Sequence, residues 1–367
     1  MSVLSGEAEV SDWGLFARRL VIFGFFGLVL SYAAGATDLG ASFLGRAAIF
    51  ALIGLSLNIL MGYAGQISLG HNAFVGVGAF AASFLTAKQG LPMYISIPMA
   101  AAIGGITSVI LGAVALRIRG LYLALITLAY GLMVERSIFE ITELTGGGAG
   151  TQVFRPEPFV SDNVFTFVCF GVLGIIYYLD WRMMSTKFGR ALLAMKSNEQ
   201  VAASLGMNPV FYKLAAFIMA GTIAGLAGGL LAFNQQLVVS QDFTFATALT
   251  YVIMVVVGGL GQRLGAVIGS FLIAYLVNLL EVLGRFLEND SFPEFLQTFG
   301  GGIPISQVAI TSLLLLLTIT LYPGGIYQQL EPVWIWLSGK PFPRHHGHDD
   351  ADPVQAEASV TTGLGGG

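Results

Sequence analysis

The sequence predicts an all-α, polytopic integral membrane protein with about ten transmembrane helices and both termini in the cytoplasm. The mean hydropathy is +0.79, and only 10% of the 367 residues are charged. An average soluble domain has roughly 25% charged residues, so most of this chain's surface cannot face water. Glycine supplies 48 residues, nearly twice the usual share of ~7%. Such a glycine content suits helices that approach one another closely in lipid.

Apolar runs of roughly 17 to 25 residues, the length that spans a bilayer as a helix, recur along the chain. They lie near residues 20–36, 46–61, 67–87, 93–115, 120–139, 164–181, 211–233, 244–260, 265–284 and 304–322. The second and third runs are glycine-rich and also allow a broken or re-entrant segment. The first run lacks a cleavage site and is interpreted as a retained helix. We therefore expect a cytoplasmic segment at 1–19, a membrane domain at 20–339 and a disordered cytoplasmic tail at 340–367.

Basic residues predict the orientation, because they are enriched in cytoplasmic loops. If the N-terminus is cytoplasmic, the basic residues on that side are Arg18, Arg19, Arg117, Arg119, Arg182, Lys187, Arg190, Lys196, Lys213, Arg263, Lys340 and Arg344. Those at or near the outer side are Arg46, Lys88, Arg136, Arg155 and Arg285. This asymmetry places the long loop 182–208 in the cytoplasm.

The charges argue against an ion-coupled carrier, which usually places acidic residues or histidine in mid-membrane positions. Here the candidates lie toward helix ends: Glu135, Arg136, Glu140, Asp180, Glu281 and Arg285. The chain is not expected to be an enzyme either. Gly339-Lys340 lacks the flanking residues of a phosphate-binding loop, and no nucleophile–base pair or metal-ligand spacing stands out. We expect no cofactor bound by the chain, no nucleic-acid partner and an energy source outside it.

The loop 182–208 is predicted to contain short helices. Asn198 can cap a helix that begins at Glu199, an acid favoured at a positive helix N-terminus, and Gly206 suits the left-handed residue that ends it. Asn208 then caps the next helix, with Pro209 at its first position. Ala202, Ala203 and Leu205 form an apolar face, and Lys187, Arg190 and Lys196 a basic one. The loop is either a surface helix on the lipid headgroups or a docking site for a cytoplasmic partner.

Three stretches resemble one family of transport proteins. They are GRALLAMKSNEQVAASLGMNPVFYKLAAF at 189–217, LNILMGYAGQISLGHNAFVGVGAFAA at 57–82 and VVVGGLGQRLGAVIGSFLI at 255–273. In this order they resemble the signatures of the permease subunits of branched-chain amino acid ABC importers, in particular the larger of the two. Ribose-type sugar permeases share the general architecture but fit these motifs less well. Family members often have alanine where this chain has Asn72, and the stretch 144–158 matches only loosely.

The resemblance implies a bacterial inner-membrane importer. A second homologous permease, two cytoplasmic ATPase subunits that use ATP and Mg²⁺, and a periplasmic substrate-binding protein would be its partners in the lipid bilayer. It also implies that the cytoplasmic loop docks on the ATPase. The coupling residues would be Gly189, Arg190, Glu199, Ala203 and Gly206. The substrate stays open among branched-chain and other amino acids, urea, short amides and aromatic acids. An ion-coupled carrier and a non-transporting scaffold are the rival classes.

Other features have two interpretations each. Gly221, Gly225 and Gly229 recur every four residues, as do Gly261, Gly265 and Gly269; each trio indicates close helix packing or a substrate path. Gln66, Ser68 and His71 follow a cytoplasmic turn, where they either cap and hydrogen-bond helices or line the translocation path. The His345-His346-Gly347-His348 run either binds a metal or belongs to a disordered tail. The second interpretation is preferred, so no metal site is expected.

Overall fold

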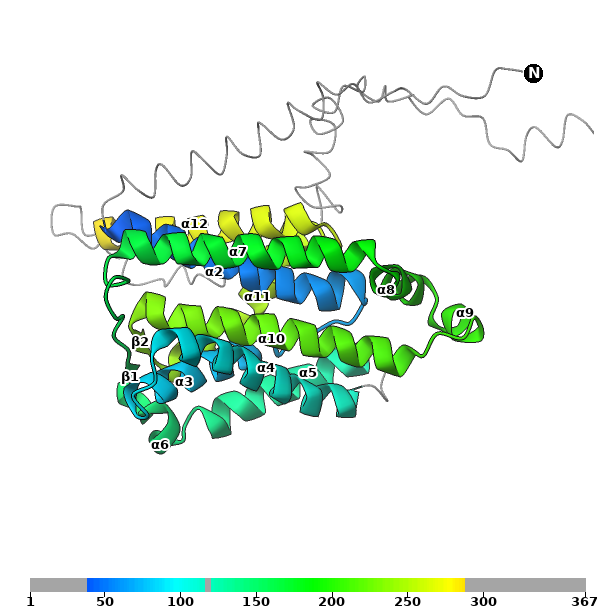
Figure 1. Cartoon of the computed structure of the whole chain (residues 1–367), viewed down its shortest axis with the longest axis horizontal. Helices are drawn as coiled ribbons and strands as arrows, with labels where there is room; N and C mark the ends of the chain where they lie inside the picture. Colours follow the sequence, from blue (N-terminus) through cyan, green and yellow to red (C-terminus); the bar gives the residue numbers. More distant parts are fainter. Residues whose placement is uncertain (1–37, 116–119, 288–367) are drawn as a thin grey trace, which may run out of the picture. The chain divides into compact units, whose positions relative to one another are not determined.

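The computed structural model describes residues 38–115 and 120–287, and the statements below concern this part of the chain. Its regular structure is helical apart from one antiparallel pair of two-residue strands, as the sequence predicts. The elements are α2 (Asp38–Leu57), η1 (Asn58–Tyr63), α3 (His71–Ala87), α4 (Met93–Ala115), α5 (Leu121–Met133), η2 (Val134–Ile138), α6 (Thr142–Thr145), η3 (Gly147–Ala149), β1 (Thr151–Gln152), α7 (Asp162–Ser185), α8 (Lys187–Ser197), α9 (Glu199–Ser204), α10 (Pro209–Gln235), β2 (Leu237–Val238), η4 (Ser240–Phe243), α11 (Phe245–Gly258) and α12 (Arg263–Leu287). Long helices lie side by side (Figure 1).

Four of the described helices are long and apolar enough to cross a membrane: Gly40–Tyr63, Met93–Ala113, Asp162–Ser185 and Pro209–Gln235. A fifth span is present if the pair Tyr122–Ile138 and Thr142–Ala149, bent by 86°, counts as one. Every apolar run expected between residues 46 and 284 falls on a described helix. The expected runs 20–36 and 304–322, the segment 1–19 and the tail 340–367 lie outside the described residues. The count of ten and the placement of the termini therefore stay predictions.

α10 lies at the centre of the described helices, with α3 and α4 on one side and α2 on the other. Gly221, Gly225 and Gly229 of α10 face α4. A Cβ at Gly225 would lie 2.6 Å from the carbonyl oxygen of Ala100, and a Cβ at Gly221 would lie 2.3 Å from Ser108 Cβ. Small residues thus let the two backbones meet, which matters in lipid because packing has to stabilise the helix pair without a hydrophobic drive.

The expectation that Gly261, Gly265 and Gly269 share one helix face is wrong for Gly261. α12 begins at Arg263, and Gly261 lies in the preceding turn with a φ of +83°. The chain reverses direction between α11 and α12, and this turn uses the left-handed region that glycine enters without a Cβ clash. Gly269 lies within α12 against α11, where a Cβ would come 2.2 Å from the Met254 carbonyl oxygen.

The apolar helices α3 and α11 are shorter than the four candidate membrane spans. α3 has 17 residues and α11 has 14. α2 continues into the π-helix η1, and the chain then returns through residues 64–70 before α3 begins. The first residue of α3, His71, lies beside Ser56 of α2, which precedes η1. α3 therefore starts within the helical layer, as the glycine-rich second and third runs allow for a re-entrant segment.

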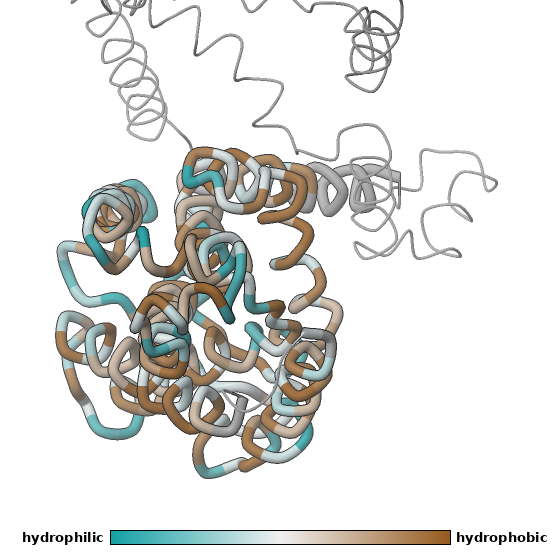
Figure 2. Tube along the Cα trace, turned by 90° about the vertical axis from the view of Figure 1, so that its right-hand side faces the viewer, coloured by the Kyte–Doolittle hydropathy of each residue, from teal (hydrophilic) through white to brown (hydrophobic). Residues whose placement is uncertain are grey.

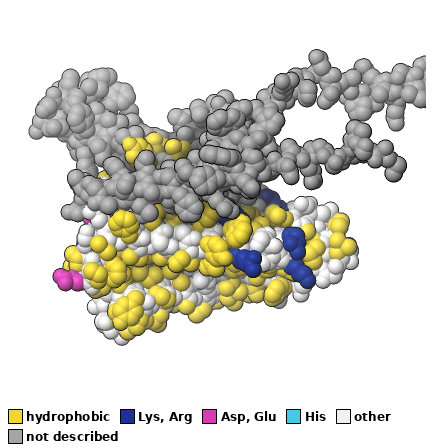
Figure 3. Space-filling view, turned by 45° about the horizontal axis from the view of Figure 1, so that its top comes forward, with side chains coloured by type: hydrophobic (Ala, Val, Ile, Leu, Met, Phe, Trp, Pro, Cys, Tyr) yellow, Lys and Arg dark blue, Asp and Glu magenta, His cyan; other side chains and the backbone are white. Residues whose placement is uncertain are grey.

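The outward flanks of the helices are apolar. Exposed side chains include Tyr94, Ile106, Ile110, Ile175 and Tyr275, and apolar residues colour most helices in Figure 2. Figure 3 shows hydrophobic side chains over most of the visible described face, with basic side chains near the end that carries α8 and α9. A surface of this kind is suited to lipid, because large exposed apolar areas are rare on soluble proteins.

The two ends of the helices differ. α8 and α9 mark one end, here called the α8–α9 end, and α6, β1 and β2 mark the other, the β1–β2 end (Figure 1). The turn 64–70 and the α11–α12 turn also lie at the α8–α9 end, because Lys196 of α8 contacts residues of both.

Candidate coupling site and transport path

α8 turns back against the end of α7 at a glycine. A Cβ at Gly189 would lie 2.5 Å from Met184 Cα, so only glycine permits this approach. The next residue, Arg190, donates from Nη1 to the Ser185 carbonyl oxygen at 3.4 Å. Gly189 and Arg190, two of the residues that the motif singles out, thus hold the junction of α7 with α8.

The ends of α9 follow from local residues, as the sequence predicts. Asn198 Oδ1 accepts two backbone N–H groups at the start of α9, each at 3.1 Å. Gly206 has a φ of +85° and ends the helix in the left-handed region. Asn208 caps α10 in the same way, and Pro209 is the first residue of that helix. These predictions are confirmed.

Glu199 at the start of α9 pairs with a lysine of α10. Its Oε2 lies 2.7 Å from Lys213 Nζ, and the lysine side chain is only 7% exposed. This ion pair ties the short helix α9 to the central helix α10. The sequence singled out Glu199 for its charge at a helix N-terminus, but it treated Lys213 only as a basic residue of the cytoplasmic side.

The apolar face expected from Ala202, Ala203 and Leu205 is split between two directions, which corrects the sequence interpretation. Ala202 is buried and packs α9 onto the protein, whereas Ala203 is exposed and Leu205 is 74% exposed. An α-helix has about 3.6 residues per turn, so two adjacent alanines point in different directions. Val201 is also exposed, and it joins Ala203 and Leu205 in an outward apolar surface.

Lys196 links α8 to the membrane helices. Its Nζ donates to the carbonyl oxygen of Gly62 in η1 at 2.7 Å. A Cβ at Gly261, in the α11–α12 turn, would lie 3.8 Å from the same Nζ. That turn is in addition joined to η1, because Gly261 N donates to Asn58 Oδ1 at 2.8 Å. Three segments far apart in sequence therefore meet at Lys196.

A second polar contact at this end joins α7 to α12 and η1. Asp180 of α7 is buried and accepts from Arg263 Nε at its Oδ2. The same oxygen accepts from Tyr63 Oη at 3.0 Å. The sequence placed Asp180 toward a helix end, and the structure shows that two other elements bond its Oδ2, whereas its Oδ1 has no partner among the described residues.

The three residues expected at the transport path do not form one cluster. Gln66 folds onto its own turn, with Nε2 donating to the Ala64 carbonyl oxygen at 3.3 Å. Ser68 is fully buried, and its hydroxyl has no hydrogen-bond partner among the described residues. His71 is also fully buried, at the first position of α3.

His71 is held in one orientation by α2. Its Nε2 lies 2.7 Å from Ser56 Oγ, and Ser56 Oγ donates its hydrogen to the Ile53 carbonyl oxygen at 2.7 Å. The serine hydroxyl has one hydrogen, so it accepts from Nε2–H of the imidazole. Nδ1 is then an acceptor in the neutral ring, and it has no partner in the described part of the chain.

Asn72, which the sequence comparison with the motif singled out, is bonded to a distant segment. Its Nδ2 donates to the carbonyl oxygen of Phe243 in η4 at 2.8 Å. No sequence signal identified this partner, because it lies 171 residues away. The side-chain oxygen Oδ1 has no partner among the described residues.

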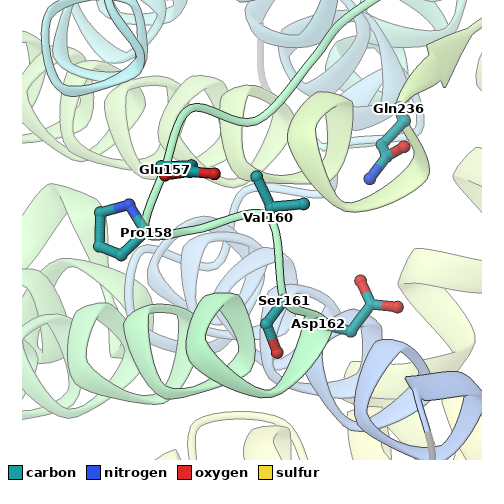
Figure 4. Close-up of a pocket in the computed structure, with 6 residues that line it drawn as sticks. All are labelled: Glu157, Pro158, Val160, Ser161, Asp162 and Gln236. Atoms are coloured by element: carbon teal, nitrogen blue, oxygen red, sulfur yellow. The ribbon is translucent and has the colours of Figure 1, made fainter.

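The β1–β2 end has an open cavity of about 560 Å³. Figure 4 shows Glu157 and Gln236 on different sides of it, from the loop before α7 and the end of α10. Its other lining residues are Pro158, Val160, Ser161 and Asp162. Asp162 is paired with the buried Arg155, so one of the two acidic side chains at the cavity wall is held by an ion pair.

Metal-ligating residues do not cluster in residues 38–115 and 120–287, where no group of three His, Cys, Asp or Glu side chains could hold an ion. The His345–His348 run and its two interpretations lie outside these residues.

The described residues form a helical protein with four or five candidate membrane spans and a helical loop joined to them at one end. The chain belongs to the family described as branched-chain amino acid transport system / permease component, whose model matches residues 39–320. This confirms the family predicted from the motifs. The high-affinity branched-chain amino acid transport permease LivM of Salmonella typhimurium is 29% identical over 70% of this chain and 65% of its own length. LivM of Escherichia coli has the same identity and coverage.

The match thus spans less than two thirds of the length of these two relatives. The ribose import permease RbsC of Escherichia coli is 27% identical over 56% of this chain and 66% of its own length. This likeness to a sugar permease extends over a shorter part of the chain, in line with the poorer fit of the motifs to ribose-type permeases.

Proposed function

We propose that the chain is the permease subunit of a binding-protein-dependent ABC importer that carries branched-chain or other amino acids across the bacterial inner membrane. ATP hydrolysis in separate subunits would drive alternating access. This subunit would pair with a second homologous permease around one pathway. Two cytoplasmic ATPase subunits, with ATP and Mg²⁺, would bind the α8–α9 end, and a periplasmic binding protein would deliver solute at the β1–β2 end.

The single observation that carries this proposal is the way in which α8 and α9 are joined to the membrane helices. Lys196 connects α8 to η1, and the Glu199–Lys213 pair connects α9 to α10. A load applied to α8 and α9 would therefore reach α2 and α10 directly. Rigid-body movement of this kind is a common way to switch a transporter between two states.

In this proposal the ATPase docks on the outward surface of α9. Val201, Ala203 and Leu205 are exposed, and the preceding helix α8 has exposed basic residues such as Arg190. A small apolar surface with a charged rim is typical of protein interfaces. The proposal uses Gly189, Arg190, Glu199, Ala203 and Gly206 for coupling, and Ser68 and His71 for the pathway, with Gln66 at its inner turn.

The substrate is proposed at the level of the family. Amino acids are favoured because the two LivM permeases, which match a larger share of this chain than the ribose permease does, belong to branched-chain amino acid transport systems. Urea, short amides and aromatic acids are the alternative solutes for an importer of this type. An ion-coupled carrier is less well supported, since three of the described carboxylates, those of Asp162, Asp180 and Glu199, are each paired with a basic side chain of the chain itself.

The test is the substitution Ala203→Asp. A carboxylate in a desolvated interface costs on the order of a few kcal/mol if it stays unpaired, and such a loss lowers affinity about a hundredfold or more. We expect normal membrane insertion of the variant, loss of co-purifying ATPase subunits, and loss of ATP-driven uptake. Pull-down from detergent-solubilised membranes measures the first loss, and proteoliposome uptake the second.

The matched control is Ser197→Asp, which adds the same charge to an exposed position of the loop outside the apolar surface of α9. This control should keep the ATPase bound. Undiminished ATPase recovery with Ala203→Asp would show that the loop lies on lipid headgroups and that the coupling site is elsewhere. Uptake by the chain alone in ATP-free vesicles under an imposed ion gradient would favour the ion-coupled carrier instead.

A further inference from the structure

The start of α3 carries a buried amide that is only half satisfied. Asn72 is 1% exposed, and its Nδ2 donates to the Phe243 carbonyl oxygen. Its Oδ1 has no partner in the described part of the chain. An acceptor left unpaired in a protein interior costs roughly 1–3 kcal/mol, so such atoms call for a donor that is absent from the chain itself.

This amide lies where two short apolar helices, α3 and α11, begin. Phe243 stands two residues before Phe245, the first residue of α11, so Asn72 bridges the N-termini of α3 and α11. The N-cap residues of these helices are Gly70 and Thr244, and neither makes a side-chain cap bond. The N-termini of discontinuous helices carry partial positive charge and commonly face the solute in membrane transporters.

The Glu135 carboxylate lies at the start of α11. Glu135 Oε2 accepts from the backbone N–H of Phe245 at 3.1 Å. Glu135 belongs to the π-helical segment η2, and π-helical turns inside α-helices are frequent at functional sites. One turn earlier, a Cβ at Gly131 would lie 3.2 Å from Asn72 Oδ1. The amide oxygen of Asn72 therefore faces the same side of α5 and η2 as Glu135.

The chemistry of these groups points to a hydrogen-bond donor. Asn72 Oδ1 and the Glu135 carboxylate are both acceptors, and they lie next to helix N-termini that favour a negative group. A zwitterionic amino acid or a short amide presents N–H donors next to a carboxylate or carbonyl oxygen.

We propose that Asn72 is a specificity-determining residue of the transport path, whose Oδ1 accepts a hydrogen bond from an N–H group of the transported solute. The inference rests on the proposed importer function and deepens it. The shared chemistry is the N–H donor, which either the ammonium group of an amino acid or the NH₂ group of an amide supplies.

The experiment uses the complete importer, with its partner subunits and binding protein, in proteoliposomes loaded with ATP. Uptake of leucine is compared with that of N,N,N-trimethylleucine, and uptake of propionamide with that of N,N-dimethylpropionamide, because neither methylated solute has an N–H group on the tested nitrogen. The ratio of parent to methylated solute is measured for the wild type and for Asn72→Ala. The same binding protein serves both proteins, so its own preference cancels when the two ratios are compared. Uptake of leucine or of propionamide by the wild type shows whether the donor is an ammonium group or an amide NH₂ group.

We expect Asn72→Ala to lower the ratio for the transported solute about tenfold, which corresponds to one lost hydrogen bond. Asn72→Asp keeps oxygen acceptors and loses the Nδ2 donor, so it should retain the discrimination even if the bond to Phe243 is weakened. The control Asn234→Ala removes another buried asparagine, on α10, and should leave the ratio unchanged. A purely structural role of Asn72 would slow both solutes equally.

An unchanged ratio in Asn72→Ala, or an equal loss for parent and methylated solutes, would overturn the inference while ATP-driven uptake still supports the importer. If the wild-type assembly takes up neither solute and recovers no ATPase subunits, the importer function itself fails, and the inference fails with it. ATPase pull-down thus separates the two failures.

Discussion

At the scale of single residues, the contact between Glu199 and Lys213 shows how the loop depends on one ion pair. Lys213 lies in the first turns of α10 with its ammonium group almost enclosed. A buried charge that loses its partner is destabilising, because the remaining charge keeps its desolvation cost without compensation.

The first prediction therefore concerns Glu199→Gln, which keeps the shape and removes the charge. We expect faster amide hydrogen exchange over residues 199–206 and lower ATP-driven uptake, with about 1–3 kcal/mol lost from the docking of α9. The neighbouring change Gln200→Glu, at an exposed position, is the matched control and should change neither quantity.

Exchanging the two charges provides the decisive comparison. Glu199→Lys combined with Lys213→Glu should recover part of the uptake that either single change removes. If the double variant is no better than the worse single variant, the ion pair is not what holds α9 to α10.

At the scale of elements, α10 and α4 pack through small residues. Gly225 lies so close to Ala100 and Gly104 that a Cβ would meet backbone atoms at 2.6 and 3.0 Å. Backbone atoms cannot rotate away as side chains do, so the helices would have to separate. The same face of α10 also serves α3, where a Cβ at Gly78 would come 2.2 Å from the Gly225 carbonyl oxygen.

Gly225→Leu should therefore reduce the yield of folded, membrane-inserted protein, because overpacking at one site costs about 1–3 kcal/mol. Gly174→Leu is the matched control. Gly174 lies in α7 with nothing within 4 Å of an added Cβ, so its leucine variant should insert normally. Yields from size-exclusion chromatography measure both, and normal yield with Gly225→Leu would show that the α10–α4 contact tolerates separation.

At the scale of the whole molecule, the two ends of the helices should face opposite sides of the membrane. Basic residues of the loop 182–208 favour the cytoplasm for the α8–α9 end. The β1–β2 end, with its open cavity, would then face the periplasm. The last prediction is about this orientation.

Ser197→Cys in α8 should not react with a membrane-impermeant thiol reagent in intact spheroplasts, and it should react after permeabilisation. Gly148→Cys at the β1–β2 end should react in both cases, because the position is exposed. The native Cys169 is buried and adds little background. Labelling of Ser197→Cys from outside would reverse the orientation and place the proposed ATPase site on the wrong side.

The sequence by itself determined the membrane class, the family and the local helix ends in the loop. Hydropathy is a property of each side chain, so a run of apolar residues predicts a span in any tertiary arrangement. The caps at Asn198 and Asn208 involve backbone groups two or three residues away, and Gly206 acts through its own φ. Such features require no knowledge of the rest of the chain.

Only the tertiary structure decided which distant groups meet. The partners of Lys196 and Asn72 lie 134 and 171 residues away along the chain. Whether Gly261 is helical and whether Ala202 or Ala203 faces outward depend on where a helix begins and which face the neighbouring helices cover. The physical reason is that helix packing in lipid depends on the shapes of whole surfaces. Hydrogen bonds between distant segments form only after that packing has brought donor and acceptor together.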